Sequence, residues 1–200
     1  MEILLASQNR GKIAELGELL ADQKIQVRSL LDFPAYEDIE ETGRTFAENA
    51  ALKARAAMTK TGLLTLADDS GLEVEALSGA PGVYSARFAG EQGNAEKNID
   101  KLLALMTDIP EEKRGARFRC SLVIVTLDGK EYLVEGSVEG QILHQRQGEG
   151  GFGYDPVFYL PELSRTMAEL SATQKNSLSH RAQAFRKALP ILAEIINDKA

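Results

Sequence analysis

Disulfides are the first feature that the sequence lacks, since its 200 residues include a single cysteine. Cys120 lies in the apolar run Cys120–Val125, so we expect a buried thiol in a protein from a reducing compartment. No apolar stretch approaches the length that spans a bilayer, and the first residues, Met1–Ala6, lack the basic region of a signal peptide. These absences argue against a secreted disulfide-stabilised domain and against a membrane protein. We therefore expect a cytoplasmic protein.

Positive charge is also scarce, because 23 lysines and arginines are outnumbered by 30 aspartates and glutamates, for a formal net charge of −7. General binding to the DNA or RNA backbone requires a basic surface, which such a chain does not provide. A small polyanion could still bind in a locally basic pocket. We therefore expect a small-molecule substrate, and neither nucleic acid nor a membrane as a partner.

Internal repeats, low-complexity segments and linkers are absent from the sequence as well. The hydrophobic content of 44% is enough for a substantial core. A chain of this length suits one domain, expected at residues 1–200, either compact or with two lobes around a cleft.

Short apolar runs and hydrophobic periodicity predict an α/β fold. Strands are expected at Ile3–Ala6, Ile25–Leu31, Leu63–Ala67 and Leu72–Leu77. Two longer β-like segments, 118–127 and 130–142, are joined by Asp128-Gly129, a strong hairpin signal, so the sheet should be mixed. Helices are expected around residues 12–20, 45–61, 94–106 and 180–196, the last kinked or interrupted at Pro190.

Two adjacent carboxylates, Asp68 and Asp69, directly follow the apolar run Leu63–Ala67. An apolar run ended by a glycine-bearing turn predicts a strand passing into a loop, with the carboxylates held near solvent. Because adjacent charges repel, a divalent cation between or beside them would be favourable, and Mg²⁺ takes such ligands together with substrate phosphates. An Asp-Asp-Ser-Gly run is also a common turn, so this stretch alone does not establish catalysis.

A polar loop, Ser7–Lys12, separates the first strand from the first helix. This arrangement directs backbone N–H groups and a helix N-terminus beyond the strand, which favours phosphate binding, and Lys12 adds a positive charge. The G-x-x-x-x-G-K-[ST] spacing of a Walker A loop is absent, and an ordinary turn with a solvated lysine is the alternative. In the acidic segment 32–44, Glu40 or Glu41 could complete a metal site at the aspartate pair.

The helix after this segment begins with a capping box, in which Thr45 is the N-cap and Glu48 is the third helical residue. Asn49 and Lys53 lie four residues apart and therefore on one face. Two polar groups on a stripe of an otherwise apolar helix could face a cleft, although a solvated face is the commoner explanation.

A glycine-rich stretch, Gly148–Pro156, is the second region that indicates ligand binding. Glycine allows the backbone to approach a ligand closely, and Phe152 or Tyr154 could stack on a base or anchor the loop in the core. His180 and Arg181 lie in the first turn of the last helix, where cations oppose the helix dipole. That position favours an anion or a planar polar ligand nearby.

Taken together, these motifs resemble the inosine/xanthosine triphosphate pyrophosphatase family. They occur in the family's order and span nearly the whole chain, which makes the set far more specific than any one member. The matching segments are 7–12, 40–43 with 46–50 and 53–54, 67–71, 79–82 with 84–87, 151–156 and 179–181. Ser7 departs from the family, which more usually has threonine here, but the hydroxyl is kept.

The resemblance implies hydrolysis of ITP, dITP or XTP to the monophosphate and pyrophosphate, with Mg²⁺ and usually by a homodimer. It implies an α/β fold with a mixed, twisted sheet, flanking helices and two lobes around a central cleft. Asp69 is the implied general base, and Asp69 with Glu40 would lie near Mg²⁺, with Asp68 as a further candidate ligand. The implied substrate contacts are Ser7, Gln8, Asn9, Arg10, Gly11, Lys12, Lys53 and Ser70 at the phosphates, and Phe152, Gly153, Tyr154, Asp155, Lys175, His180 and Arg181 at the base and sugar.

Selectivity for the base would follow from its 6-keto oxygen, with which a donor such as Arg181 can pair, whereas adenine presents an amino group there. Two alternatives stay open from the sequence. One is a pyrophosphatase of modified pyrimidine or canonical nucleoside triphosphates, which would differ in the base pocket. The other is a non-catalytic nucleotide-binding module, although a pure binder of a polyanion gains little from adjacent carboxylates.

Overall fold

The computed structural model describes residues 2–20, 25–33, 36 and 39–197. The strands are β1 (Glu2–Leu5), β2 (Gln26–Ser29), β3 (Leu64–Val74), β4 (Gly115–Val125), β5 (Glu131–Ile142), β6 (Phe158–Leu160) and β7 (Arg165–Thr166). The α-helices are α1 (Arg10–Leu20), α2 (Phe46–Thr61), α3 (Ala95–Leu105), α4 (Ala172–Leu178) and α5 (His180–Asn197). None of the helices in these described ranges is long and apolar enough to cross a membrane.

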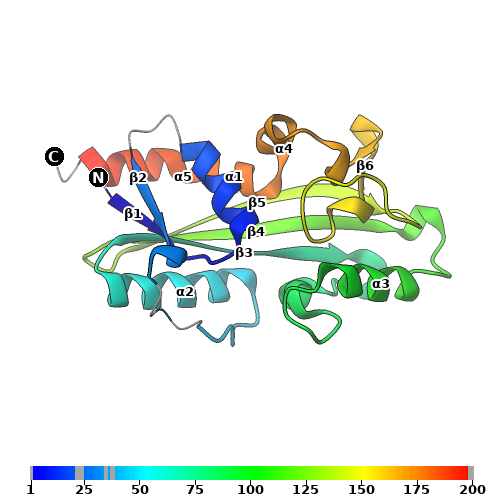
Figure 1. Ribbon diagram of the computed structural model, residues 1–200, viewed down its shortest axis with the longest axis horizontal. Helices are drawn as coiled ribbons and strands as arrows, with labels where there is room; N and C mark the ends of the chain where they lie inside the picture. Colours follow the sequence, from blue (N-terminus) through cyan, green and yellow to red (C-terminus); the bar gives the residue numbers. More distant parts are fainter. Residues whose placement is uncertain (1, 21–24, 34–35, 37–38, 198–200) are drawn as a thin grey trace. The chain divides into compact units, whose positions relative to one another are not determined.

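The seven strands form one sheet in the order β2-β1-β3-β4-β5-β6-β7 (Figure 1). β1 pairs in parallel with β2 and β3, whereas β6 pairs antiparallel with β5 and β7. The sheet is therefore mixed, and the predicted α/β class with flanking helices is confirmed.

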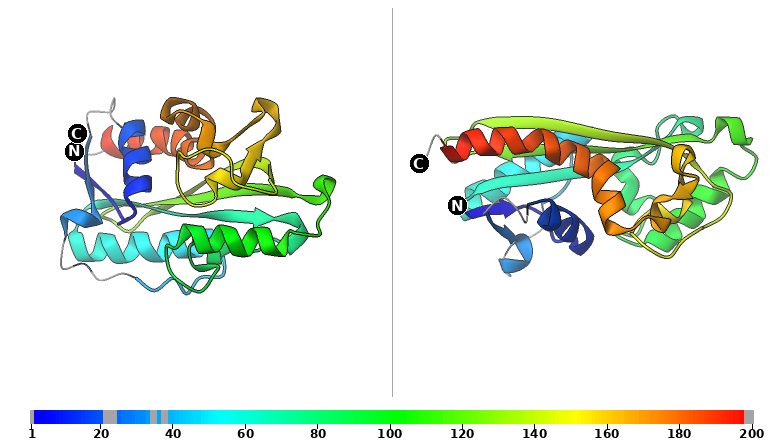
Figure 2. Two further views of the ribbon diagram at one scale, coloured as in Figure 1. Left: turned by 45° about the vertical axis from the view of Figure 1, so that its right-hand side comes forward. Right: turned by 90° about the horizontal axis from the view of Figure 1, so that it is seen from above.

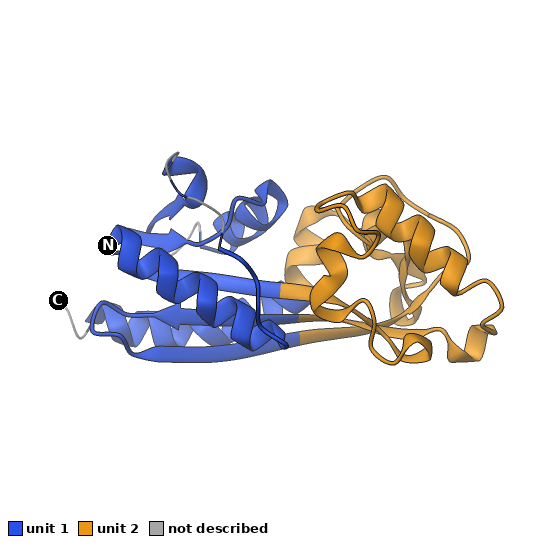
Figure 3. Ribbon diagram, turned by 90° about the horizontal axis from the view of Figure 1, so that it is seen from below, with its two compact units in different colours: residues 1–69, 120–136, 180–200 blue, residues 70–119, 137–179 orange. Residues whose placement is uncertain are grey.

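The chain divides into two compact units (Figure 3). Unit 1 comprises residues 1–69, 120–136 and 180–200, and unit 2 comprises residues 70–119 and 137–179. Both units are discontinuous in sequence, because β3, β4 and β5 each contribute residues to both.

Helices cover both faces of the sheet in unit 1, and the alternation of side chains along β1 explains how (Figure 1). Ile3 and Leu5 pack with α1 and α5, while Leu4 and Ala6 pack with α2. Cys120 belongs to the cluster with α5, which confirms the predicted buried thiol. Figure 2 shows α5 lying along the part of β4 and β5 that belongs to this unit.

Unit 2 has its own core, in which α3 packs against the sheet through Ile99, Leu102 and neighbouring residues. Phe118 and Phe158 lie in this core with ring centroids 4.4 Å apart. Arg114 is buried directly before β4, and its guanidinium donates to backbone carbonyls at the end of α3 and the end of β5. The accepting carbonyls belong to Met106, Ile109, Ile142 and Leu143.

Two predicted boundaries are wrong. β3 does not end before the aspartate pair but continues to Val74, so that residues 64–67 and 72–74 belong to one strand and Glu75–Leu77 form a 3₁₀ turn. α1 begins at Arg10, inside the segment predicted as a loop. α5 runs through Pro190 without interruption, so of the two predicted effects of this proline only a kink stays a prediction. Part of the acidic segment, residues 34–35 and 37–38, lies outside the described residues.

Candidate active site

Asp68 and Asp69 are adjacent in β3, and successive side chains of a strand point to opposite faces of the sheet. Asp68 therefore lies on the face covered by α1 and α5, where it meets Lys12 and Arg181. Asp69 lies on the face covered by α2, where it meets Asn49 and Lys53. Because the pleat of the strand separates the two carboxylates, the structure favours the second predicted arrangement, a cation beside one of them, over a cation shared between both.

Asp69 is held at both carboxylate oxygens by side chains of α2. The amide nitrogen of Asn49 donates to Oδ2 at 3.1 Å, and the ammonium of Lys53 lies 3.4 Å from Oδ1. Burial raises the pKa of Asp69 above its ordinary value, although the charges of Lys53 and Lys12 oppose this shift. A carboxylate with a raised pKa is a stronger base than an ordinary exposed carboxylate.

Glu41, and not the predicted Glu40, is the glutamate that the structure places at this carboxylate. Its Oε1 lies 2.9 Å from the ammonium of Lys53, which also contacts Asp69, whereas the side chain of Glu40 is exposed. Burial disfavours the charged form of Lys53, but the carboxylates of Asp69 and Glu41 outweigh it and raise the lysine pKa. The lysine is therefore a fixed positive charge between two carboxylates.

This pair of carboxylates fits a divalent cation. Carboxylate oxygens of Asp69 and Glu41 both lie close to the ammonium of Lys53. Mg²⁺ is commonly bound by one or two such carboxylates together with substrate phosphates. Within the part of the chain that the structure describes, no group of three or more His, Cys, Asp or Glu could hold a metal on its own. A metal at Asp69 and Glu41 would thus need further ligands from water or from the substrate.

On the opposite face of β3, Asp68 connects two cations. Its side chain is fully buried, and Oδ2 lies 2.9 Å from Nζ of Lys12 and 3.2 Å from Nε of Arg181. Arg181 also pairs with Glu15 of α1, a residue that the sequence did not single out. Although burial opposes its charge, these two carboxylates raise the pKa of Arg181, which stays a cation.

The predicted phosphate loop is short and exposed. The side chain of Asn9 accepts the backbone N–H of Lys12 at 3.1 Å and so caps α1, while Ser7 Oγ accepts the N–H of Asn9 at 3.2 Å. Gln8 and Arg10 are exposed at the start of this helix. The loop therefore presents a capped helix N-terminus with Lys12 in its first turn.

In unit 2, Phe152, Asp155 and Lys175 form one group. Asp155 Oδ2 accepts the ammonium of Lys175 at 2.8 Å and the backbone N–H of Phe152 at 2.9 Å. The same ammonium lies 4.5 Å from the centre of the Phe152 ring. Gly151 must remain glycine here, because its φ is +73° and a Cβ would lie 2.1 Å from Oδ2 of Asp155.

Tyr154 lies in the core of unit 2, and its hydroxyl donates to the backbone carbonyl of Ser85 at 2.9 Å. Its ring is therefore an anchor of the loop, and Phe152, which is half-buried, is the aromatic that can stack on a base. Burial also raises the pKa of Tyr154, which keeps the phenol neutral. The remaining predicted residues are placed as follows: Gly153 is half-buried in the same loop, Ser70 is half-buried in β3, and His180 is buried at the start of α5.

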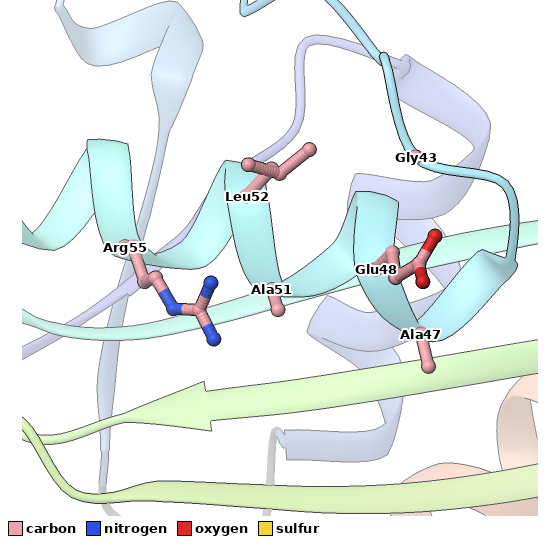
Figure 4. Close-up of a pocket in the computed structure, with 6 residues that line it drawn as sticks. All are labelled: Gly43, Ala47, Glu48, Ala51, Leu52 and Arg55. Atoms are coloured by element: carbon pink, nitrogen blue, oxygen red, sulfur yellow. The ribbon is translucent and has the colours of Figure 1, made fainter.

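A surface pocket of about 390 Å³ lies beside α2 (Figure 4). It is lined by Gly43, Ala47, Glu48, Ala51, Leu52 and Arg55. None of the carboxylate-site residues Glu41, Lys53 or Asp69 contributes to it, so the pocket is separate from that site.

The whole chain is similar to known proteins in both sequence and structure. The sequence matches the Ham1 family over residues 3–191. A protein of Desulforamulus reducens named dITP/XTP pyrophosphatase is 54% identical over 192 residues, which are 96% of this chain and 96% of the relative. A protein of the same name from Geobacillus kaustophilus is 50% identical over 198 residues, covering 99% of this chain and 97% of the relative.

Solved structures agree with this match. The HAM1 protein of Coxiella burnetii is 44% identical and superposes with a TM-score of 0.87 over 97% of this chain and 99% of that protein. The Ham1 protein of Staphylococcus aureus is 43% identical, with a TM-score of 0.86 and the same coverage. Sequence and fold therefore point to the same set of relatives.

Proposed function

Because the chain belongs to the Ham1 family, we propose that it is a nucleoside triphosphate pyrophosphatase that hydrolyses ITP, dITP and XTP to the monophosphate and pyrophosphate. The observation that carries this proposal is the buried Asp69 carboxylate, held by Asn49 and Lys53 beside Glu41. Relatives named dITP/XTP pyrophosphatase match over nearly their full length and support the substrate class.

Asp69 acts in this proposal as the general base. Its Oδ2 accepts the Asn49 amide at 3.1 Å and its Oδ1 accepts the longer bond from Lys53 at 3.4 Å, so Oδ1 is the less tightly held oxygen and is proposed to take the proton of the attacking water. The water oxygen forms a bond to the α-phosphorus, and the bond from that phosphorus to the bridging oxygen breaks. The products are the nucleoside monophosphate and pyrophosphate, and the chain itself is not changed covalently.

Asp69 and Glu41 would hold a divalent metal, which we propose to be Mg²⁺, and Glu40 is replaced by Glu41 in this assignment. Mg²⁺ would neutralise charge on the phosphate oxygens as the bond breaks. Lys53 would add a positive charge beside the same oxygens. Asp68 is excluded from this metal site by its position on the opposite face of β3.

The phosphates would bind at the capped N-terminus of α1, with Lys12 as the charged group and the exposed loop Ser7–Gly11 as backbone donor. Ser70 is proposed as a further hydroxyl donor. Asp68 would keep Lys12 in place, because it pairs with the ammonium at 2.9 Å.

The base would stack on Phe152, with Asp155 and Lys175 as neighbouring polar groups. His180 and Arg181 stay assigned to the base and sugar. For Arg181, this role requires a donor beyond those that pair with Asp68 and Glu15, and a guanidinium has five N–H groups. We also propose a single domain over residues 1–200 that forms a homodimer, supported for the domain by the family match over 3–191.

A substrate panel tests the function. Pyrophosphate release with Mg²⁺ is measured side by side for ITP, XTP, GTP, ATP and dTTP, and again after EDTA. We expect release from ITP and XTP, little from the other three, and none with EDTA. Release from canonical or pyrimidine nucleotides instead would support the alternative pyrophosphatase, and no release from any of them by folded protein would support a binding module.

Phe152→Ala is expected to raise KM for ITP by about tenfold and to lower kcat much less, since stacking on a base contributes about 1–3 kcal/mol to binding. Phe88→Ala is the matched control, because Phe88 is also a half-buried ring in unit 2 with a lysine ammonium 4.4 Å from its centre. Steady-state kinetics of both variants with ITP make the comparison. An unchanged KM for Phe152→Ala would mean that the ring only anchors its loop.

A further inference from the structure

Asn49 is a buried side chain whose amide makes two different hydrogen bonds. It lies in the first turns of α2 with no exposed surface. Its Nδ2 donates to Asp69 Oδ2 at 3.1 Å, and its Oδ1 accepts the backbone N–H of Gly43 at 2.8 Å. A backbone N–H can only donate and an ionised carboxylate can only accept, so these two partners allow only one orientation of the amide.

The two hydrogen bonds connect Asn49 to β3 and to the segment before α2, which carry the proposed metal ligands Asp69 and Glu41. Asp69 comes from β3, and Gly43 lies two residues after Glu41 in the segment before α2. With Oδ2 bound to Asn49, Oδ1 is the oxygen of Asp69 that faces Lys53 and, through it, Glu41. The helix itself does not require this side chain, because its backbone bond to Thr45 is already made.

The same contact leaves no room for a side chain at Gly43. A Cβ at this position would lie 2.6 Å from Oδ1 of Asn49, 2.8 Å from Cβ of Glu48 and 2.9 Å from the backbone nitrogen of Asn49. Two of these atoms belong to the start of α2 and cannot move without moving the helix. Glycine therefore lets the segment that carries Glu41 approach the helix closely enough to bond to Asn49.

We infer that Asn49 is a positioning residue, which aims Oδ1 of Asp69 at the metal and the attacking water and holds the Glu41 segment against α2. This inference rests on the proposed function. Partners that orient metal ligands typically change metal affinity or activity by about 10–100-fold when they are removed.

Asn49→Leu removes both hydrogen bonds at nearly constant size. We expect it to raise the dissociation constant for Mn²⁺ by at least about tenfold, measured without turnover by the EPR signal of free Mn²⁺ in the presence of a non-hydrolysable α,β-methylene analogue of ITP. We expect kcat with Mg²⁺ to fall by a similar factor and KM for ITP to change by less than about threefold, since the nucleotide contacts stay in place. Gly43→Ala should shift the same two quantities in the same direction, and it serves as the test if Asn49→Leu does not fold.

Thr65→Val is the matched control. Thr65 is fully buried in β3, four residues before Asp69, and its hydroxyl donates to the Leu63 carbonyl at 2.9 Å. Its replacement should lower the melting temperature while leaving Mn²⁺ affinity and kcat unchanged. The inference is overturned if Asn49→Leu and Gly43→Ala behave like Thr65→Val. If wild-type protein releases no pyrophosphate from any nucleotide, the proposed function fails first and the inference with it.

Discussion

Asp69→Asn is expected to lower kcat for ITP by about 10³-fold, within the range that general acid–base catalysis supplies. The amide has the shape of the carboxylate but cannot take the proton of the attacking water, and it is a weaker metal ligand. The measurement is pyrophosphate release at saturating ITP and Mg²⁺. Asp68→Asn is the control, which tests whether the loss of kcat is specific to Asp69. Because Asp68 orients Lys12, this variant should affect KM more than kcat.

Asp69→Asn should not unfold the protein. The ordinary pKa of the carboxyl is 3.8, and burial raises the pKa of Asp69 in the folded state. Folded protein therefore keeps a proton that the unfolded chain has already released, so stability contributed by this group declines as pH rises from 3.8 through the folded pKa. At pH 7 the ionised carboxylate costs stability, and its removal should leave the melting temperature of metal-free protein unchanged or higher.

Thermal unfolding in EDTA, followed by circular dichroism at pH 7, measures this effect, with Lys53 still paired to Glu41 in the variant. A lower melting temperature together with lost turnover would mean that Asp69 is mainly structural. Turnover near the wild-type value would remove it as the general base.

Arg114→Met is expected to destabilise the protein by about 3–5 kcal/mol, the largest stability effect that we anticipate. The arginine is 2% exposed, and its guanidinium donates to the carbonyls of Met106, Ile109, Ile142 and Leu143. Methionine fills similar space but removes the donor from these carbonyls. The Met106 carbonyl keeps the backbone N–H of Ile109, and each buried carbonyl that is left unsatisfied costs about 1–3 kcal/mol. For a chain of this size the melting temperature should fall by about 10 °C.

Arg117→Met is the matched control, because Arg117 lies in β4 three residues after Arg114 and is about half exposed beside Glu73. Exposed ion pairs contribute about 0–1 kcal/mol, so this variant should melt close to wild type. Equal melting temperatures for the two variants would show that the carbonyls at the ends of α3 and β5 find other donors.

The local pattern of the sequence was sufficient to predict much of the fold and to propose where the site lies. Periodicity and caps predicted most of the strands and helices, including the capping box at Thr45, whose side chain accepts the N–H of Glu48. The motifs named the phosphate loop, the aspartate pair and the loop at Phe152. These features are encoded by neighbours in the chain, so they can be read without knowing the tertiary structure.

Long-range packing decided the rest. Ser70 and Gly71 suggest a turn after the aspartates, but pairing in the sheet extends β3 through them, and the pleat then sends Asp68 and Asp69 to opposite faces. Pairing across the sheet is a tertiary interaction, and it overrides the local preference of a turn-forming sequence.

The choice among candidate residues was tertiary as well. Glu40 and Glu41 are equivalent in the sequence, and the structure distinguishes them by the bond that Lys53 donates to Glu41 and by the exposure of Glu40. In the sequence, Tyr154 could either stack on a base or anchor its loop. The hydrogen bond from its hydroxyl to the Ser85 carbonyl favours the anchor. Residue types and their order determined what chemistry this protein can carry. The contacts between distant segments decided which side chains meet at the candidate site, because a side chain's partners are set by the packing of elements far apart in the chain.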